Sequence, residues 1–145
     1  MNLGNVVRFR KQVEDLIKEE LALAEWEKSQ EKAKEQGLQR DMIQIAGELE
    51  QELPQGVSGA YAAERYRWLD ETSQTLERQG ETIKRHEEKI AGLQDKLKEA
   101  HQARRVIELL MAKDQLKQKQ RNHRSEQREQ DDLGNLRYTQ SEMGM

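Results

Sequence analysis

Three histidines, His86, His101 and His123, are the side chains best suited to proton transfer or metal binding in this sequence. A zinc-binding helix needs two histidines one turn apart, and the His86-Glu87-Glu88 segment lacks the second histidine. The chain contains no cysteine, which excludes disulfides, thiolate metal sites and cysteine nucleophiles. The nine glycines form no phosphate-binding loop ahead of a strand. We therefore predict a non-enzymatic protein with no catalytic residues, no metal and no cofactor.

The composition of the 145-residue chain is unsuited to a globular core. Charged residues make up 37% and hydrophobic residues 34%, and the mean hydropathy is -1.13. The 25 basic and 28 acidic residues are mixed, with a net charge of -3, and only one proline is present. Abundant Glu, Lys, Gln, Arg, Leu and Ala favour long helices. The composition predicts an all-α protein whose helices pack through a narrow apolar seam.

Several classes of protein are disfavoured by the same composition. No run of 18 apolar residues is present and the first ten residues lack an apolar leader segment, so we expect no membrane insertion and a cytoplasmic location. A pI of about 5.7 argues against a dedicated nucleic-acid-binding protein.

One cluster of helix-breaking residues divides the chain, namely Pro54-Gln55-Gly56-Val57-Ser58-Gly59. Ser58 is a suitable N-cap for the helix that follows, and the next comparable break is Gly134. The sequence predicts a single coiled-coil hairpin over residues 1–145. It has a helix over about 6–53, a turn at 54–59, a longer helix over about 60–133 and a flexible tail at 134–145.

Heptad spacing is clearest in the second predicted helix. Two series with a period of seven lie three residues apart, an arrangement that predicts a left-handed antiparallel coiled coil with the first helix. The first series is Leu69, Leu76, Ile83, Ile90, Leu97, Arg104 and Met111; the second is Thr72, Gln79, His86, Leu93, Ala100 and Ile107.

The first predicted helix carries a matching but interrupted seam. Its members are Val6, Phe9, Val13, Leu16 or Ile17, Leu21 and Ala24, and then Leu38, Met42, Ile45, Leu49 and Leu53 or Glu52. Between Trp26 and Gln36 the only aliphatic residue is Ala33, so we expect looser packing or a skip in register there. Trp26 then either fills the gap or contacts a partner.

The two helices differ in length: at a rise of 1.5 Å per residue, about 10–53 spans roughly 65 Å and about 60–133 spans roughly 110 Å. Antiparallel pairing from the turn uses the second helix to about residue 107, which leaves Leu109–Asp132 without an intramolecular partner. Residues 113–128 carry six basic and two acidic groups, whereas residues 1–53 carry eight basic and twelve acidic groups. We expect this basic overhang to dock on an acidic protein surface; an anionic membrane or a nucleic acid is the alternative.

Short segments along the chain resemble one known family. These segments are Phe9-Arg10-Lys11, Arg67-Trp68-Leu69, Gln74-Thr75-Leu76-Glu77 and the polar run Glu126–Asp132. Together with the length and the central turn, they make the chain similar to the FliJ family of flagellar export proteins. Members of that family resemble the central stalk of rotary ATPases.

The resemblance implies a set of partners. These are the hexameric flagellar export ATPase, whose assembly and activity the stalk promotes, a membrane export gate protein, and export chaperones. It also implies a location on the cytoplasmic side of the membrane at the flagellar base, with peripheral attachment. No nucleic acid and no direct membrane insertion are implied.

The same resemblance implies the residues that bind these partners. ATPase-binding positions would be Phe9, Arg10, Val13, Leu16, Lys113, Lys117, Arg121, Arg124 and Arg128. Export-gate-binding positions would be Leu38, Met42, Ile45, Leu49, Leu76 and Ile83. The gate set coincides with the predicted seam, so either the coil opens there or only its edge is used. Three alternatives remain open: the equivalent stalk of a virulence type III secretion system, a coiled-coil scaffold without an ATPase partner, and a basic helix for membrane or nucleic acid.

Overall fold

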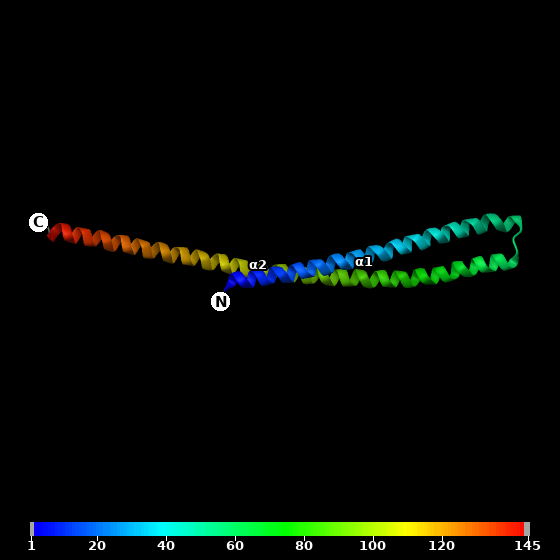
Figure 1. The fold of residues 1–145 in the computed structure, drawn as a ribbon, viewed down its shortest axis with the longest axis horizontal. Helices are drawn as coiled ribbons and strands as arrows, with labels where there is room; N and C mark the ends of the chain where they lie inside the picture. The colour runs from blue at the N-terminus through cyan, green and yellow to red at the C-terminus, as the bar shows by residue number, and fades with distance from the viewer. Residues whose placement is uncertain (1, 144–145) are drawn as a thin grey trace. The chain divides into compact units, whose positions relative to one another are not determined.

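The computed structural model of the chain describes residues 2–143. Its elements are α1 (Leu3–Glu52), a short 3₁₀ helix η1 (Leu53–Gln55) and α2 (Gly59–Met143), and the described residues contain no strand (Figure 1). The chain divides into two compact units. The hairpin unit is Glu14–Glu99, and the terminal unit combines Met1–Val13 with Ala100–Met145. The predicted all-α fold with two helices, the second longer, is confirmed.

The turn of the hairpin unit forms where the sequence places its helix-breaking residues. Pro54 lies in the first turn of η1, and Gly56 ends η1 with a φ of 84°, a left-handed conformation that only glycine adopts without strain. The hydroxyl of Ser58 accepts a 3.1 Å hydrogen bond from the backbone N–H of Tyr61. Ser58 is therefore the N-cap of α2, as the sequence predicts.

Burial along α2 follows the predicted heptads. All thirteen positions of the two series, from Leu69 to Met111, are buried or half-buried. Thr72, Ile83, Ile90 and Leu93 are the buried members. The period of seven therefore identified the packing face of this helix correctly, including its polar members.

Burial along α1 reveals one unbroken seam in the hairpin unit. Steps of three and four residues alternate without a skip, and every position in the series is at least half-buried. The series is Glu14, Ile17, Leu21, Ala24, Lys28, Glu31, Glu35, Leu38, Met42, Ile45, Leu49 and Glu52. The sequence allowed either Leu16 or Ile17, and either Leu53 or Glu52, as seam residues. Ile17 and Glu52 lie in the seam, whereas Leu16 and Leu53 are exposed. The expected skip in register does not occur.

The best-buried apolar cluster of the hairpin unit joins the two helices. Ala24 of α1 packs with Ile90 and Leu93 of α2, and Leu21 lies against them. Leu49 on α1 and Ile83 on α2 are also buried. Because few large side chains are involved, most of the packing stability comes from many small contacts along the seam.

Helix α2 extends to Met143, beyond the end expected near residue 133, and only residues 144–145 of the expected tail lie outside the described residues. Gly134 does not end the helix, because a single glycine in a helix costs only about 1 kcal/mol relative to alanine. Its neighbours on both sides include good helix formers. All residues from Ala112 to Glu142 are exposed, so this stretch has no packing partner among the described residues of the terminal unit.

Replacing the buried Leu93 by alanine should lower the free energy of unfolding by about 2–3 kcal/mol, because it leaves a cavity beside Ala24 and Ile90. The exposed Leu116→Ala is the matched control and should change stability by less than about 0.5 kcal/mol. Urea unfolding followed by circular dichroism measures both. Equal effects of the two substitutions would contradict the assignment of the seam.

Candidate functional site

The stretch of α1 that lacks apolar residues is held to α2 by polar contacts. The side-chain amide of Gln79 donates to the carboxylate of Glu31 at 2.6 Å and to the backbone carbonyl of Glu31 at 3.1 Å. An ion pair joins Lys28 to Glu87 at 3.4 Å. These residues replace an apolar layer while keeping the alternation of three and four, which explains why the seam continues here without a skip.

Histidine 86 also contributes to this polar part of the seam. Its Nδ1 lies 3.8 Å from a carboxylate oxygen of Glu27, and its side chain is half-buried. A polar seam residue with a specific partner on the facing helix favours one register over its neighbours. Trp26, in contrast, is largely exposed, so it does not fill the gap in the seam and its ring is accessible to a partner.

Near the turn, one aromatic ring and one guanidinium are stacked on α2. The guanidinium of Arg65 lies 5.1 Å from the centre of the Tyr61 ring, and its Nε donates to the Tyr61 hydroxyl at 3.2 Å. This hydrogen bond raises the pKa of Arg65 above its ordinary value, and Glu48 and Glu52 on α1 raise it further. The Arg65 cation thus lies near the carboxylates of Glu48 and Glu52 on α1, an attraction that water and salt screen.

The residues assigned to gate binding all lie in the hairpin unit and belong to its seam. Leu49 and Ile83 are buried, and Leu38, Met42, Ile45 and Leu76 are half-buried. The Glu31–Gln79 contact sets the register of the two helices, and counting one heptad toward the turn from each places Leu38 beside Thr72. The structure therefore brings this set together along one interface, with the edges of the four half-buried side chains accessible.

The residues assigned to ATPase binding are mostly exposed. Phe9 and Leu16 on α1 are 62% and 60% exposed, and Arg10 is also exposed. Val13 is half-buried. The five basic residues of α2 all lie in its exposed part: Lys113, Lys117, Arg121, Arg124 and Arg128.

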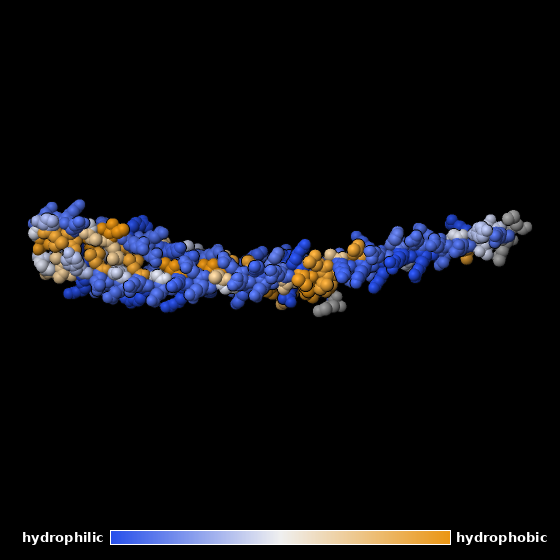
Figure 2. All heavy atoms as spheres, turned by 180° about the vertical axis from the view of Figure 1, so that it is seen from behind, coloured by the Kyte–Doolittle hydropathy of each residue, from blue (hydrophilic) through white to orange (hydrophobic). Residues whose placement is uncertain are grey.

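The structure also reveals a surface that the sequence analysis missed. We call it the apolar patch; it consists of Val106, Leu109, Leu110 and Leu116 on α2, which are 50–58% exposed. Figure 2 shows apolar atoms gathered in this part of the terminal unit, with hydrophilic surface beyond it. The signal was present in the sequence, because Leu109, Leu110 and Met111 are consecutive and only Met111 fits the seam.

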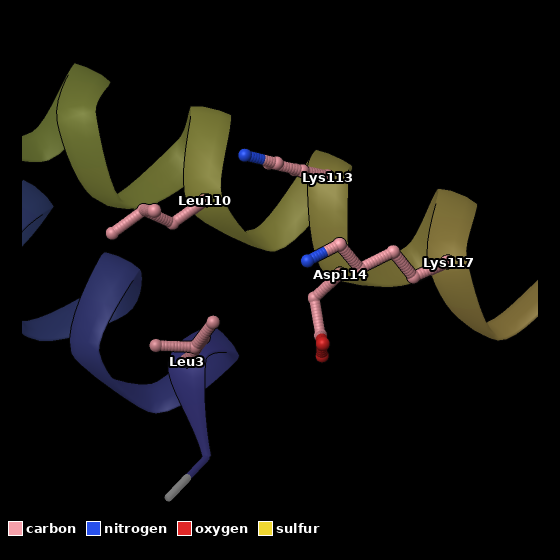
Figure 3. Close-up of a pocket in the computed structure, with 5 residues that line it drawn as sticks. All are labelled: Leu3, Leu110, Lys113, Asp114 and Lys117. Atoms are coloured by element: carbon pink, nitrogen blue, oxygen red, sulfur yellow. The ribbon is translucent and has the colours of Figure 1, made fainter.

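A shallow depression adjoins the apolar patch within the terminal unit. Leu3 at the start of α1 and Leu110 of α2 face one another across it (Figure 3). Lys113, Asp114 and Lys117 line the rest of the depression, one to two helical turns further along α2. The surface therefore combines leucine side chains with a rim of two ammonium groups and one carboxylate, and an apolar patch with a polar rim is typical of an interaction site.

Residues 2–143 offer neither a metal-binding cluster nor a membrane-spanning helix. No group of three or more His, Asp or Glu side chains is arranged to hold a metal ion. Neither α1 nor α2 contains a stretch long and apolar enough to cross a membrane.

Comparison with protein families identifies the chain. The family described as "Flagellar FliJ protein" matches residues 1–143. The chain belongs to the FliJ family. The family predicted from the sequence segments is therefore confirmed, and this FliJ-family chain is a flagellar, export-associated protein. Neither a curated protein nor a solved structure matches it.

The polar contact between Glu31 and Gln79 predicts a non-additive pair of substitutions in this FliJ-family hairpin. Gln79→Leu alone should destabilise the protein by about 1 kcal/mol, because the half-buried Glu31 carboxylate loses its donor on α2 and keeps only the 3.5 Å contact with Lys34 on its own helix. Adding Glu31→Leu should restore or exceed the original stability, because two facing leucines form an apolar layer. Thermal unfolding of the two single variants and the double variant tests this, and strictly additive effects would contradict the contact.

Proposed function

We propose that the chain is a non-enzymatic stalk of the flagellar type III export apparatus. It binds the hexameric export ATPase and promotes assembly and ATP hydrolysis of the ring. It also links the ring to the membrane export gate protein and handles export chaperones. This places it in the cytoplasm, peripherally associated with the membrane at the flagellar base.

The exposed part of α2 is the observation that carries this proposal. Residues 112–142 form a helix with no packing partner among the described residues of their unit. A solitary helix with so few apolar residues is marginal in water, so binding a partner would stabilise it. Six basic groups between Lys113 and Arg128 favour a partner with an acidic surface. The proposed contact with the ring therefore requires acidic residues on the ring.

The beginning of α1 supports a contact of the same kind. Phe9 and Leu16 expose large apolar side chains seven residues apart, and Arg10 lies next to Phe9. Exposed apolar residues at helical spacing are typical of a helix that docks in a groove. We therefore keep Phe9, Arg10, Val13 and Leu16 as ring-contact positions, with Val13 contributing its accessible edge.

The gate-binding surface is proposed on the hairpin unit. Leu38, Met42, Ile45 and Leu76 are half-buried and present an apolar edge without separation of the helices. Leu49 and Ile83 are buried and would contact a partner only if the hairpin opened. The polar contacts of Glu31, Gln79 and Lys28 next to this region make the adjoining interface less apolar, so local opening there would expose less apolar surface to water.

The first test is the turnover of a purified flagellar export ATPase titrated with this chain. The chain should stimulate ATP hydrolysis, and Arg121→Glu with Arg124→Glu should raise the half-maximal concentration by at least about tenfold, because two cations facing an acidic surface become anions. Lys96→Glu with Lys98→Glu, which changes the net charge equally on the exposed side of the paired part of α2, is the matched control and should behave as the unmodified chain.

The outcomes of this titration separate the candidate functions. Equal stimulation by both double variants would mean that the basic part of α2 is not the contact. If the folded chain does not stimulate the ATPase at all, the proposal fails and a scaffold without an ATPase partner becomes the better interpretation. Stimulation only of the corresponding virulence-system ATPase would assign the chain to that apparatus.

Gate binding is tested with the soluble cytoplasmic part of the gate protein. Met42→Ala with Leu76→Ala should weaken binding by about tenfold or more, because both side chains lie on the proposed contact edge. Leu93→Ala lies in the seam away from that edge and also destabilises the hairpin, so it controls for loss of stability. Titration calorimetry below the unfolding temperature measures both. A similar loss of affinity in the double variant and in Leu93→Ala would show that binding depends on the stability of the hairpin and not on contact with Met42 and Leu76.

A further inference from the structure

A second exposed apolar face lies on α1, in the hairpin unit and outside its seam. Leu16, Leu23 and Trp26 are 57–60% exposed. They follow one another at steps of seven and three residues, so they share one side of the helix. Every seam position in this stretch of α1 is buried or half-buried, so the three side chains lie off the face that packs on α2. We call these three residues the outer stripe.

Carboxylates edge the outer stripe. Residues 15–27 carry five acidic groups and one basic group. Asp15, Glu19 and Glu20 are exposed and Glu27 is half-buried, and their spacing places all four on the same half of α1 as the stripe. A helix that docks on this face therefore needs apolar side chains at helical spacing together with cations.

The apolar patch of α2 has this composition. Its four members are 50–58% exposed, and the spacing of Lys113 and Lys117 places them on the same side of the helix. Both lysines line the depression next to Leu110 (Figure 3). The chain thus carries two exposed amphipathic faces, one with an acidic edge and one with a basic edge. Exposed apolar groups of this kind on a polar protein typically mark an interaction surface.

The two faces match in one antiparallel register, in which Leu16 is set opposite Leu116. Apolar residues then lie opposite apolar residues, and acidic residues opposite lysines. The pairs are Leu16 and Leu116, Leu23 and Leu109, Trp26 and Val106, Asp15 and Lys117, and Glu19 and Lys113. A parallel alignment of the same leucines would instead set Asp15 opposite Glu108, so the charges favour the antiparallel pair.

We propose that the outer stripe of one copy of the chain docks on the apolar patch of a second copy, as an antiparallel pair of helices. The leucines, Trp26 and Val106 supply the buried apolar surface, and the opposite charges at the edges favour this register. The contact does not depend on the proposed function. Leu16, Lys113 and Lys117 are also proposed ring contacts, so a copy engaged in this way would not present them to the ring at the same time.

Reversal of charge on either face tests the contact by sedimentation velocity. The concentration is raised to about 1 mM, because a contact of about three helical turns is small and therefore weak. The unmodified chain should self-associate as its concentration rises. Asp15→Lys with Glu19→Lys should raise the dissociation constant at least about tenfold, and so should Lys113→Glu with Lys117→Glu, because like charges then face one another. All four side chains are exposed, so the melting temperature should change little.

A mixture of the two reversed variants is the decisive measurement. Association should return to that of the unmodified chain, because each reversed face then meets a face of opposite charge on the other variant. Glu77→Lys with Glu81→Lys, and Lys96→Glu with Lys98→Glu, change the net charge equally at exposed positions outside both faces. These matched controls should each self-associate as the unmodified chain does.

The other outcomes would overturn the proposal. A monomer over the whole range of concentration would refute the contact. Association that both reversed variants retain, or that their mixture does not restore, would mean that other surfaces join the copies. Loss of association in the two controls as well would attribute the effect to net charge and not to the outer stripe and the apolar patch.

Discussion

The alternation of three and four residues along one seam is the constraint on which the hairpin unit depends. A chain with 34% hydrophobic residues can cover only a narrow stripe on each helix, so two helices stay together only if their stripes remain in phase. The series from Glu14 to Glu52 keeps that phase through Lys28, Glu31 and Glu35, where apolar side chains are missing. In this stretch the seam positions keep the alternating spacing of three and four residues, although polar residues occupy them. Hydrogen bonds and ion pairs with α2 replace the apolar contacts.

Those polar partners affect register more than they affect stability. An apolar stripe of leucines and isoleucines allows a slip of one heptad at modest cost, whereas the bond from Gln79 to Glu31 exists in a single register. The short turn at Pro54–Ser58 also restricts the register of the two helices, because it fixes where they begin to pair. Agreement between the turn and the polar contacts explains how a weakly apolar interface specifies one arrangement.

Periodicity in the sequence was sufficient to identify the fold and the packing face of α2. It could not identify the packing of α1 between Trp26 and Gln36, because heptad analysis detects apolar residues and this part of the seam is built from Lys28, Glu31 and Glu35. The end of α2 was expected near residue 133 because Gly134 is a helix-breaking residue, but the helix continues to Met143. The cost of one glycine is small and local.

The apolar patch was missed for a related reason, because a heptad series assigns each leucine either to the seam or to nothing. Leu109 and Leu110 precede Met111, which the seam uses, so the two leucines were left over with no role. On a chain this polar, apolar residues outside the seam are informative, since an exposed leucine contributes little to packing within its own unit. Subtracting the seam from the sequence before searching for function would have identified the patch.

Separating seam from surface also determines how substitutions should be interpreted in this protein. One helix, α2, packs with α1 through one face and presents the patch and the basic residues on others. A change at the buried Leu93 should alter the folded population of the hairpin and so affect every partner alike, whereas a change at the exposed Leu110 or Arg121 should leave folding intact and act only on a contact made by that side chain. Loss of binding is therefore evidence for a contact only when the altered side chain lies outside the seam, or when an equally destabilising seam substitution elsewhere leaves binding unchanged.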